Sequence, residues 1–345
     1  MIYRTPGYCR DFRCIAGDCE DSCCKGWEID IDDAAARRYA EVKGEFGERL
    51  RNSIRNGSFV LTGDERCPFL NEKGLCDIYT ELGKESLCHI CAEHPRYFEW
   101  FGTVKEGGTG LCCEASARLI LSRPFVLCEE EIPFEEAAGD YDDELFSLLL
   151  EARTSMLDAV CNDDMPFSEA LCSVLDIAAN AQKYIDIPMT GNTAAAGCHE
   201  AMAAIFRCFS ELEPIDENWI PYVRGCAEKL HGAPALKAGY IPYLRRIAAY
   251  FLFRYVMKSV YDGNVLGYAE LAAVSVLFIA QLYRCRGECS FEDCAGIAKD
   301  YSKETEYCEE NTEKLLELFG TEDFFSVNTL KALIAESFGE NVGGI

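Results

Sequence analysis

Cysteine side chains crowd the first third of the chain in spacings that suit metal binding. Twelve of the 21 cysteines precede residue 129. Most of them fall in the runs F-R-C-I-A-G-D-C-E-D-S-C-C (12–24), C-P-F-L-N-E-K-G-L-C (67–76), C-H-I-C (88–91) and the pair at 112–113. Thiolates are soft ligands that select zinc or iron-sulfur clusters, and either needs about four of them at one point. The supply is at least double that requirement.

The N-terminus and the longest apolar run of the chain indicate the cellular compartment. The N-terminus lacks the apolar stretch of a secretory signal, and the longest apolar run, Leu271 to Leu282, is too short to cross a bilayer. The sequence therefore predicts a cytoplasmic protein with no membrane partner, where reducing conditions keep cysteines available to metals. A disulfide framework is the alternative for an exported chain.

The charge balance is strongly acidic. The chain has 59 acidic and 33 basic residues, a formal charge of −26. Such a surface repels phosphate backbones, so we expect no nucleic-acid partner, whereas a lysine-rich protein would be attracted. The alternative is that the charge serves solubility alone.

The local elements around the cysteines mix helix, strand and loop. Asp32 or Asp33 can cap a helix that continues to about Arg55. Residues 96–104 are rich in aromatic side chains and predict a strand. The glycines at 106–110 predict a tight turn before a helix over 113–121, and the alternative is a glycine-rich loop that cradles a small-molecule ligand.

The fold class predicted is mainly α: a cysteine-cluster domain with little strand, packed on a C-terminal helical bundle. We expect the metal-binding domain over 1–128, an acidic linker over 129–143 and the helical domain over 144–345, where apolar residues recur at helical spacing. The helical spacing runs from Leu145 to Val160 and from Leu171 to Ala179. Further helices are expected near 193–212, 216–231, 238–261, 266–285, 291–300, 303–319 and 326–338.

The ordered motifs carry a family resemblance. F-x-C-x4-C-x3-C-C-x-G-W, then C-P-F-L-x4-G-L-C, then Cys91 with Pro95 and Arg96, and finally L-C-C before Arg118, resemble the flagellin lysine-N-methylase (FliB) family. The shorter pieces resemble the broader cysteine-cluster proteins described as zinc- or iron-chelating. The resemblance covers roughly the first 125 residues.

The resemblance implies a protein-lysine N-methyltransferase that uses S-adenosylmethionine, acts on flagellin or a similar lysine-bearing protein, and carries an iron-sulfur cluster of the 4Fe-4S type, with zinc as the alternative. The site is either structural or catalytic. Eight cysteines suit two four-cysteine sites, or one cluster with a zinc or an unligated pair. The implied ligands are Cys14, Cys19, Cys23, Cys24, Cys67, Cys76, Cys91 and Cys113, whereas Cys88 and Cys112 are less secure.

Four further residues are candidates for binding the methyl donor or lining its site. Arg96 and Arg118 could hold the donor's carboxylate, or could form structural ion pairs. Trp27 and Tyr97, with Trp100, could cage an alkyl-ammonium group through cation–π contact and line a water-excluding cleft, or could shield the metal from water. The rival function is a non-enzymatic metal-binding or electron-transfer module. A later set, with metal ligation or simple packing as its alternatives, comprises Cys285, Cys289, Cys294 and Cys308.

Overall fold

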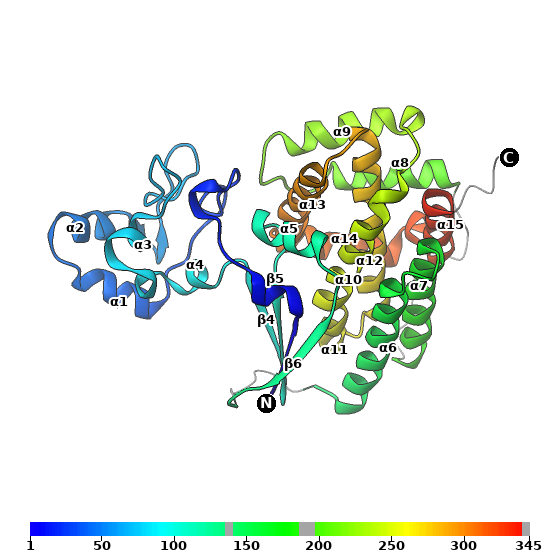
Figure 1. Cartoon of the computed structure of the whole chain (residues 1–345), viewed down its shortest axis with the longest axis horizontal. Coiled ribbons are helices and arrows are strands. Elements are labelled where there is room, and N and C mark those ends of the chain that lie inside the picture. Colours follow the sequence, from blue (N-terminus) through cyan, green and yellow to red (C-terminus); the bar gives the residue numbers. More distant parts are fainter. Residues whose placement is uncertain (135–140, 186–196, 340–345) are drawn as a thin grey trace.

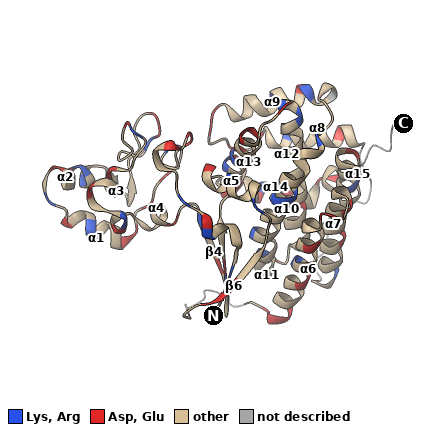
Figure 2. Cartoon of the chain, viewed as in Figure 1, with Lys and Arg blue, Asp and Glu red and all other residues tan. Residues whose placement is uncertain are grey.

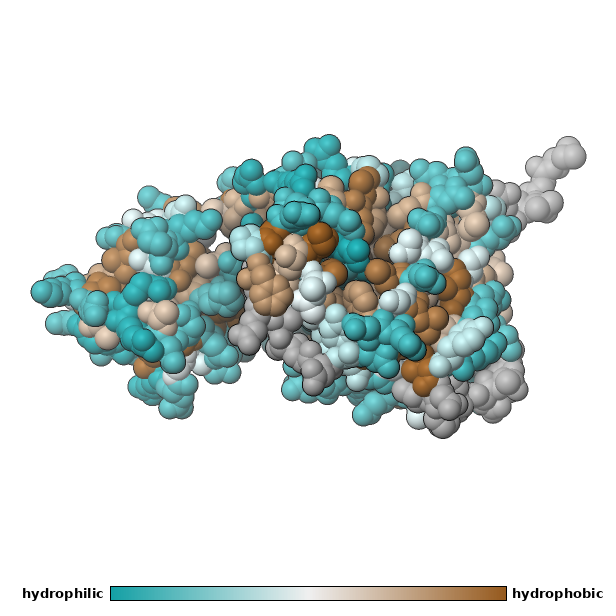
Figure 3. All heavy atoms as spheres, turned by 90° about the horizontal axis from the view of Figure 1, so that it is seen from below, coloured by the Kyte–Doolittle hydropathy of each residue, from teal (hydrophilic) through white to brown (hydrophobic). Residues whose placement is uncertain are grey.

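The computed structural model describes residues 1–134, 141–185 and 197–339. A small lobe is joined through a narrow waist to a larger body made of helices and one sheet (Figures 1 and 3). The chain is mainly α, as predicted from the sequence. We call residues 13–27 the cysteine loop, residues 28–94 the lobe, and the sheet with α5–α15 the body.

The lobe is built from short elements. Its helices and strands are α1 (Asp33–Glu41), α2 (Gly44–Asn52), β2 (Ile54–Arg55), β3 (Ser58–Phe59), α3 (Asp77–Leu82), η3 (Lys84–Ser86) and α4 (His89–Glu93). The Asp32 side chain caps α1 by accepting from the Ala35 amide at 2.9 Å, as predicted. The single helix expected to reach Arg55 is wrong, because the chain turns at Gly44, whose φ of 78° interrupts the helix.

A four-stranded sheet lies between the lobe and the helices. Its strands are β1 (Ile2–Pro6), β4 (Arg96–Phe101), β5 (Val104–Thr109) and β6 (Leu127–Glu131), in the order β4-β5-β1-β6. Strand β1 is parallel to β5 and antiparallel to β6. The strand expected over 96–104 is confirmed over 96–101, whereas Val104 begins the next strand, and the start of the expected acidic linker forms edge strand β6. Two short 3-10 helices follow β1, η1 (Gly7–Asp11) and η2 (Ala16–Asp18).

The tight turn expected over 106–110 is wrong, because Gly107 and Gly108 belong to strand β5 and Gly110 follows directly after it. The turn lies earlier, at Gly102, whose φ is 54°. A Cβ on Gly107 would lie 2.7 Å from the Phe98 ring and from the Tyr3 hydroxyl. The glycines therefore let aromatic side chains lie flat on the strand, which their sequence alone does not reveal.

The helices of the body match most of the expected segments, but the break expected between residues 300 and 303 is wrong, because one helix, Phe291–Glu306, spans it. They are α5 (Glu114–Ser122), α6 (Asp143–Cys161), α7 (Phe167–Tyr184), α8 (Cys198–Phe209), α9 (Trp219–Lys229), η4 (Leu230–Gly232), η5 (Ala238–Tyr240), α10 (Ile241–Tyr255), η6 (Val256–Lys258), α11 (Ser259–Asp262), α12 (Val265–Arg286), α13 (Phe291–Glu306), α14 (Glu309–Thr321), η7 (Asp323–Phe325) and α15 (Val327–Phe338). The first residues of the expected 193–212 helix lie outside the described residues. Helix α12 is long and apolar enough to cross a bilayer, yet its apolar window is completely buried, so it is the bundle's central helix.

Two separate hydrophobic cores stabilise the chain. The large core joins the body helices to Phe101, Leu111 and Ile120, so the sheet and α5 pack on the bundle. The small core lies within the lobe. A buried ion pair also ties β5 to α6, because Glu106 holds Arg153 through two contacts of 2.5 Å. The expected boundary at residue 128 stays a prediction.

Candidate functional site

All the cysteines of the described residues are free thiols, and those of the motifs fall into two neighbouring groups. One group lies where the cysteine loop meets the body. We call it the junction thiols: Cys14, Cys19, Cys23 and Cys113. The second group gathers around the small core of the lobe, and its first member, Cys24, comes from the end of the cysteine loop. We call it the lobe thiols: Cys24, Cys67, Cys76, Cys88 and Cys91.

The junction thiols come from two distant parts of the chain. Cys14 and Cys19 flank η2, while Cys113 is the N-cap residue of α5. The adjacent Cys24 thiol and burial raise the pKa of Cys23, and the Cys113 and Cys14 thiols add to this effect. Burial raises the pKa of Cys19 to about 12, again with a contribution from Cys113. Four thiols of one prospective site therefore lie within electrostatic reach of one another.

The lobe thiols belong to the small hydrophobic core. The Cys67 amide donates to the Cys24 carbonyl at 2.8 Å. Burial raises the pKa of Cys67 to about 12, and the thiols of Cys24, Cys76 and Cys88 contribute. Cys88 and Cys91 are hydrogen-bonded to each other at the start of α4, which lowers the pKa of Cys88 and raises that of Cys91.

The donor set fits a soft metal. Within residues 1–134, 141–185 and 197–339, no three or more His, Cys, Asp or Glu side chains stand close enough to form a metal site. The two thiol groups nevertheless each contain at least four sulfurs, the number that zinc or an iron-sulfur cluster needs. Assignment of the eight predicted ligands to a metal stays a prediction.

Trp27 lies where the cysteine loop touches the body. Its indole N–H donates to the Cys23 carbonyl at 2.6 Å, and its ring stacks on Tyr307 at 5.2 Å. His94 lies 5.6 Å from the same indole, and burial lowers its pKa to about 4. The ring cluster lies next to the backbone of Cys23, and its predicted role in shielding a metal stays a prediction. Any contact of Trp27 with a methyl donor stays a prediction.

Tyr97, the second predicted aromatic, belongs to a buried polar cluster between β4 and the bundle. We call this cluster the polar seam: Tyr97, Tyr250, Arg254, Tyr255 and Glu306. One carboxylate oxygen of Glu306 accepts from the Tyr250 and Tyr255 hydroxyls at 2.8 Å each, and from Arg254 at 2.9 Å. The Arg254 guanidinium also lies 4.6 Å from the Tyr97 ring centre.

Two buried atoms of the polar seam have no hydrogen-bond partner among the described residues. They are the second carboxylate oxygen of Glu306 and the hydroxyl of Tyr97. Burying such an atom costs folding free energy unless a bound group or a water molecule forms a hydrogen bond with it. Glu306 is 8% exposed and ends α13, and no motif in the sequence marked it as a site residue.

The two predicted arginines do not join this cluster. Arg118 forms ion pairs with Glu114 at 2.9 Å and with Glu292 at 2.7 Å. These contacts correspond to the alternative in which Arg118 forms structural ion pairs, because its guanidinium contacts a carboxylate through Nη2 and another through Nε. Arg96 is exposed at the start of β4 and lies 5.2 Å from the centre of the Phe12 ring. Donor binding by either residue stays a prediction.

The later cysteine set divides into separate contacts. Cys285 lies beside Cys226, and Cys289 beside Cys294. Cys308 instead lies 3.4 Å from a carboxylate oxygen of Glu310. These thiols form no metal-binding group in the described part of the chain.

A cavity of about 810 Å³ opens elsewhere in the body, between α7, α8, α12 and α15. His199, Met202, Arg284 and Phe338 are among the residues that line it. The Arg284 guanidinium is held by the Ala233 and Pro234 carbonyls and by Gln281. The volume suits a ligand of drug size, although no predicted site residue lines the cavity.

Family models match both parts of the chain. Residues 200–333, from α8 to α15, match the FliB lysine N-methylase C-terminal domain. The resemblance to the FliB lysine N-methylases is confirmed. Residues 13–106 match CxxCxxCC, a family described as a zinc- or iron-chelating domain, which supports a metal cofactor. The FliB match therefore lies in the helices, beyond the cysteine motifs that first indicated the family.

Three bacterial relatives are similar over part of their length. The lysine-N-methylases of Salmonella choleraesuis strain SC-B67 and Salmonella typhimurium strain LT2 are each 26% identical over 136 residues, or 36% of this chain. That alignment spans 34% of either relative. The flagellar biosynthetic protein FliU of Salmonella muenchen is 27% identical over 129 residues, 34% of this chain and 76% of FliU. No solved structure matches the chain.

The FliB-type domain and the chelating domain meet at the candidate site. Arg254, Glu306 and the rest of α13 lie within the FliB match, and Trp27 with most of the thiols lies within the chelating match. Cys113 lies outside both matched ranges.

Proposed function

We propose that this protein is a cytoplasmic protein-lysine N-methyltransferase that acts on flagellin or a similar lysine-bearing protein, with S-adenosylmethionine as methyl donor. The proposal rests on the presence, in one chain, of a match to the FliB lysine N-methylase C-terminal domain and a match to a zinc- or iron-chelating domain. Relatives named lysine-N-methylase support the reaction class.

The proposed cofactor is an iron-sulfur cluster of the 4Fe-4S type, with zinc as the alternative. The junction thiols and the lobe thiols each offer four or more sulfurs, so two sites of four ligands are our preferred arrangement. Bound metal would staple the cysteine loop and lobe, and a redox-active cluster would also supply electrons. The aromatic cover of Trp27 and Tyr307 would keep water from the junction thiols.

The polar seam is the proposed place for the substrate amine. Methyl transfer requires a lysine amine without its proton, so a nearby group must accept that proton. The free oxygen of Glu306 is an acceptor, and the Tyr97 hydroxyl can orient the amine. Tyr250 and Tyr255 hold the carboxylate in place through its other oxygen.

The decisive experiment incubates metal-reconstituted protein with flagellin and labelled S-adenosylmethionine, and maps lysine mass shifts with and without a low-potential reductant. We expect methyl-lysine in the wild type. Dependence on reductant would assign the cluster a redox role, and independence a structural role. Glu306→Gln should slow transfer by about 10²–10⁴-fold. The matched control is Glu309→Gln, an exposed carboxylate one turn further on.

The rival function is a non-enzymatic metal-binding or electron-transfer module. It predicts metal in the protein, no methyl-lysine under either condition, and no calorimetric binding of S-adenosylmethionine. That set of results would replace the methyltransferase proposal.

A further inference from the structure

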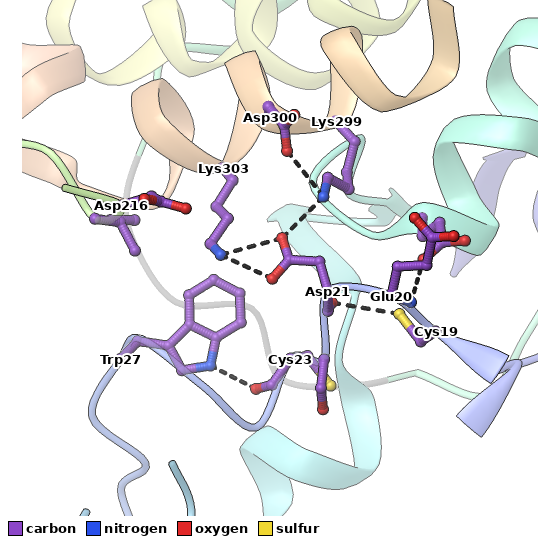
Figure 4. A network of polar contacts seen from close by, with 12 residues as sticks. Cys19, Glu20, Asp21, Cys23, Trp27, Asp216, Lys299, Asp300 and Lys303 are labelled. Atoms are coloured by element: carbon purple, nitrogen blue, oxygen red, sulfur yellow. Dashed lines mark hydrogen bonds and ion pairs between the residues drawn. The ribbon is translucent and has the colours of Figure 1, made fainter. Parts of the chain in front are cut away.

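Asp21 connects the cysteine loop to the body by an ion-pair network. It lies between Cys19 and Cys23 in the loop, and its carboxylate reaches two lysines of α13 (Figure 4). Lys299 donates to one carboxylate oxygen at 2.9 Å, and Lys303 donates to the two oxygens at 3.0 and 3.1 Å. The network therefore joins the two family domains, which are far apart in the sequence.

The two lysines are unusual because they are nearly buried. Each is 9% exposed, and the i, i+4 spacing of Lys299 and Lys303 puts both on one face of α13. A buried ammonium group needs a carboxylate partner. Lys299 has Asp300 as a second partner at 2.8 Å, whereas the carboxylate contacts of Lys303 are both to Asp21.

The same loop has further contacts beside this network. The Glu20 amide donates to the side-chain carboxylate of Glu114 at 2.9 Å. Glu114 directly follows Cys113 in the sequence. The Gly26 backbone approaches Ile215, and Trp27 stacks on Tyr307. Each of these contacts holds the cysteine loop against the FliB-type body or the adjoining α5.

The junction thiols are therefore assembled from both sides of this contact. Three of them lie on the cysteine loop, and Cys113 begins α5, which packs on α13. If the loop moved away from α13, Cys19 and Cys23 would separate from Cys113. The contact at Asp21 therefore affects how closely the loop thiols approach Cys113.

We propose that Asp21, held by Lys299 and Lys303, is a positioning residue that assembles the junction thiols into a single metal site across the boundary between the chelating and FliB-type domains. This inference rests on the metal-binding part of the proposed function. Because coupling between two equilibria is reciprocal, metal binding at the junction strengthens the docking of the loop, and docking strengthens metal binding.

The test titrates Co²⁺ into the full-length, reduced apo-protein and follows thiolate-to-cobalt absorption. Cys113→Ser and Cys67→Ser identify which binding step belongs to the junction thiols and which to the lobe thiols. Asp21→Asn should weaken the junction step by about 10–100-fold and leave the lobe step unchanged. Asp21→Glu should restore part of the affinity.

The matched control is Asp18→Asn, which removes an exposed carboxylate from the same loop. It should leave both steps unchanged. Hydrogen exchange over residues 13–27 supplies an independent reading: Asp21→Asn should speed exchange in the apo-protein, and saturating Co²⁺ should restore protection. Near-UV circular dichroism checks that the body of each variant stays folded.

Two outcomes overturn the inference in different ways. If Asp21→Asn binds Co²⁺ like the wild type in both steps and exchanges no faster over 13–27, Asp21 does not position the thiols. If the wild type shows no thiolate-to-cobalt absorption, the metal-binding part of the proposed function fails and the metal site of this inference fails with it. Exchange over 13–27 would then still decide whether Asp21 docks the loop.

Discussion

The lobe and the body solve the problem of stability by different means. The body surrounds α12, whose apolar window is completely buried, with aromatic and aliphatic side chains from many helices. The small core contains ten buried hydrophobic residues, and two of them are Cys67 and Cys88. A core this small supplies little free energy, so such domains commonly need metal or disulfides. The comparison indicates that the body can fold on apolar burial, whereas the lobe depends on its thiols.

Removal of metal should produce the largest difference between the two regions. Structural zinc in small domains contributes about 10–16 kcal/mol of apparent binding free energy, which is folding free energy. We therefore expect a strong chelator to abolish amide protection in residues 28–94 while α6 to α15 keep theirs. Hydrogen exchange with mass spectrometry measures both at once. Equal loss of protection in lobe and body would contradict the comparison.

The body should be most sensitive to loss of a buried charge partner. Glu106→Gln leaves the Arg153 guanidinium, 1% exposed, without its carboxylate. Breaking a buried pair in this way costs about 3–5 kcal/mol of the free energy of unfolding. Denaturant unfolding of Glu106→Gln should show this loss in the body, with Co²⁺ binding by the lobe thiols intact. The control Glu131→Gln, exposed on β6, should unfold like the wild type.

The contact between lobe and body should weaken in acid through His94. Burial lowers the pKa of His94 to about 4, below its ordinary value near 6.5. The neutral imidazole therefore stabilises the folded state above pH 6.5, and this contribution is lost as pH falls toward 4. The difference amounts to about 3 kcal/mol for a fully shifted buried histidine.

The measurement compares the pH dependence of unfolding in wild type and His94→Gln. The slope of the free energy of unfolding between pH 6.5 and 4 should be shallower in the variant, because glutamine does not titrate. Parallel curves would show that His94 is not responsible.

The smallest loss of stability should result from removing the side-chain cap of α1. Asp32 accepts from the amides of His89 at 2.7 Å and Ala35 at 2.9 Å, and these two donors lower its pKa. Asp32→Ala should cost about 1 kcal/mol of lobe stability. Because these donors lower its pKa, the contribution of the carboxylate to stability should be present at neutral pH and be lost only as pH falls below about 4. Thermal unfolding of the metal-loaded protein, with Asp33→Asn as control, measures the loss.

The acidic residues show which electrostatic properties can be predicted from composition and which cannot. The net charge of −26 is a property of the sequence, and the ribbon in Figure 2 shows acidic residues spread along the chain in lobe, sheet and body. Composition therefore established the sign of the charge, whereas the arrangement of individual ion pairs, such as Asp21 with two lysines, depended on packing.

The local features of this protein follow from its amino-acid sequence alone. The cap at Asp32, the strand from Arg96, the helical periodicity of the body and the cysteine motifs are all encoded within a few residues of one another. Short-range hydrogen bonds and side-chain spacing carry that information. For the same reason, the motifs alone were enough to indicate the family resemblance.

Which side chains meet is a property of the folded chain. Folding divided the motif cysteines into junction and lobe thiols, engaged Arg118 in ion pairs, and buried Glu306 beside Tyr97. It also placed the glycines of β5 under aromatic rings. These contacts join residues that are mostly distant in the sequence, and burial in a shared core selects them. No local spacing in the sequence contains that information.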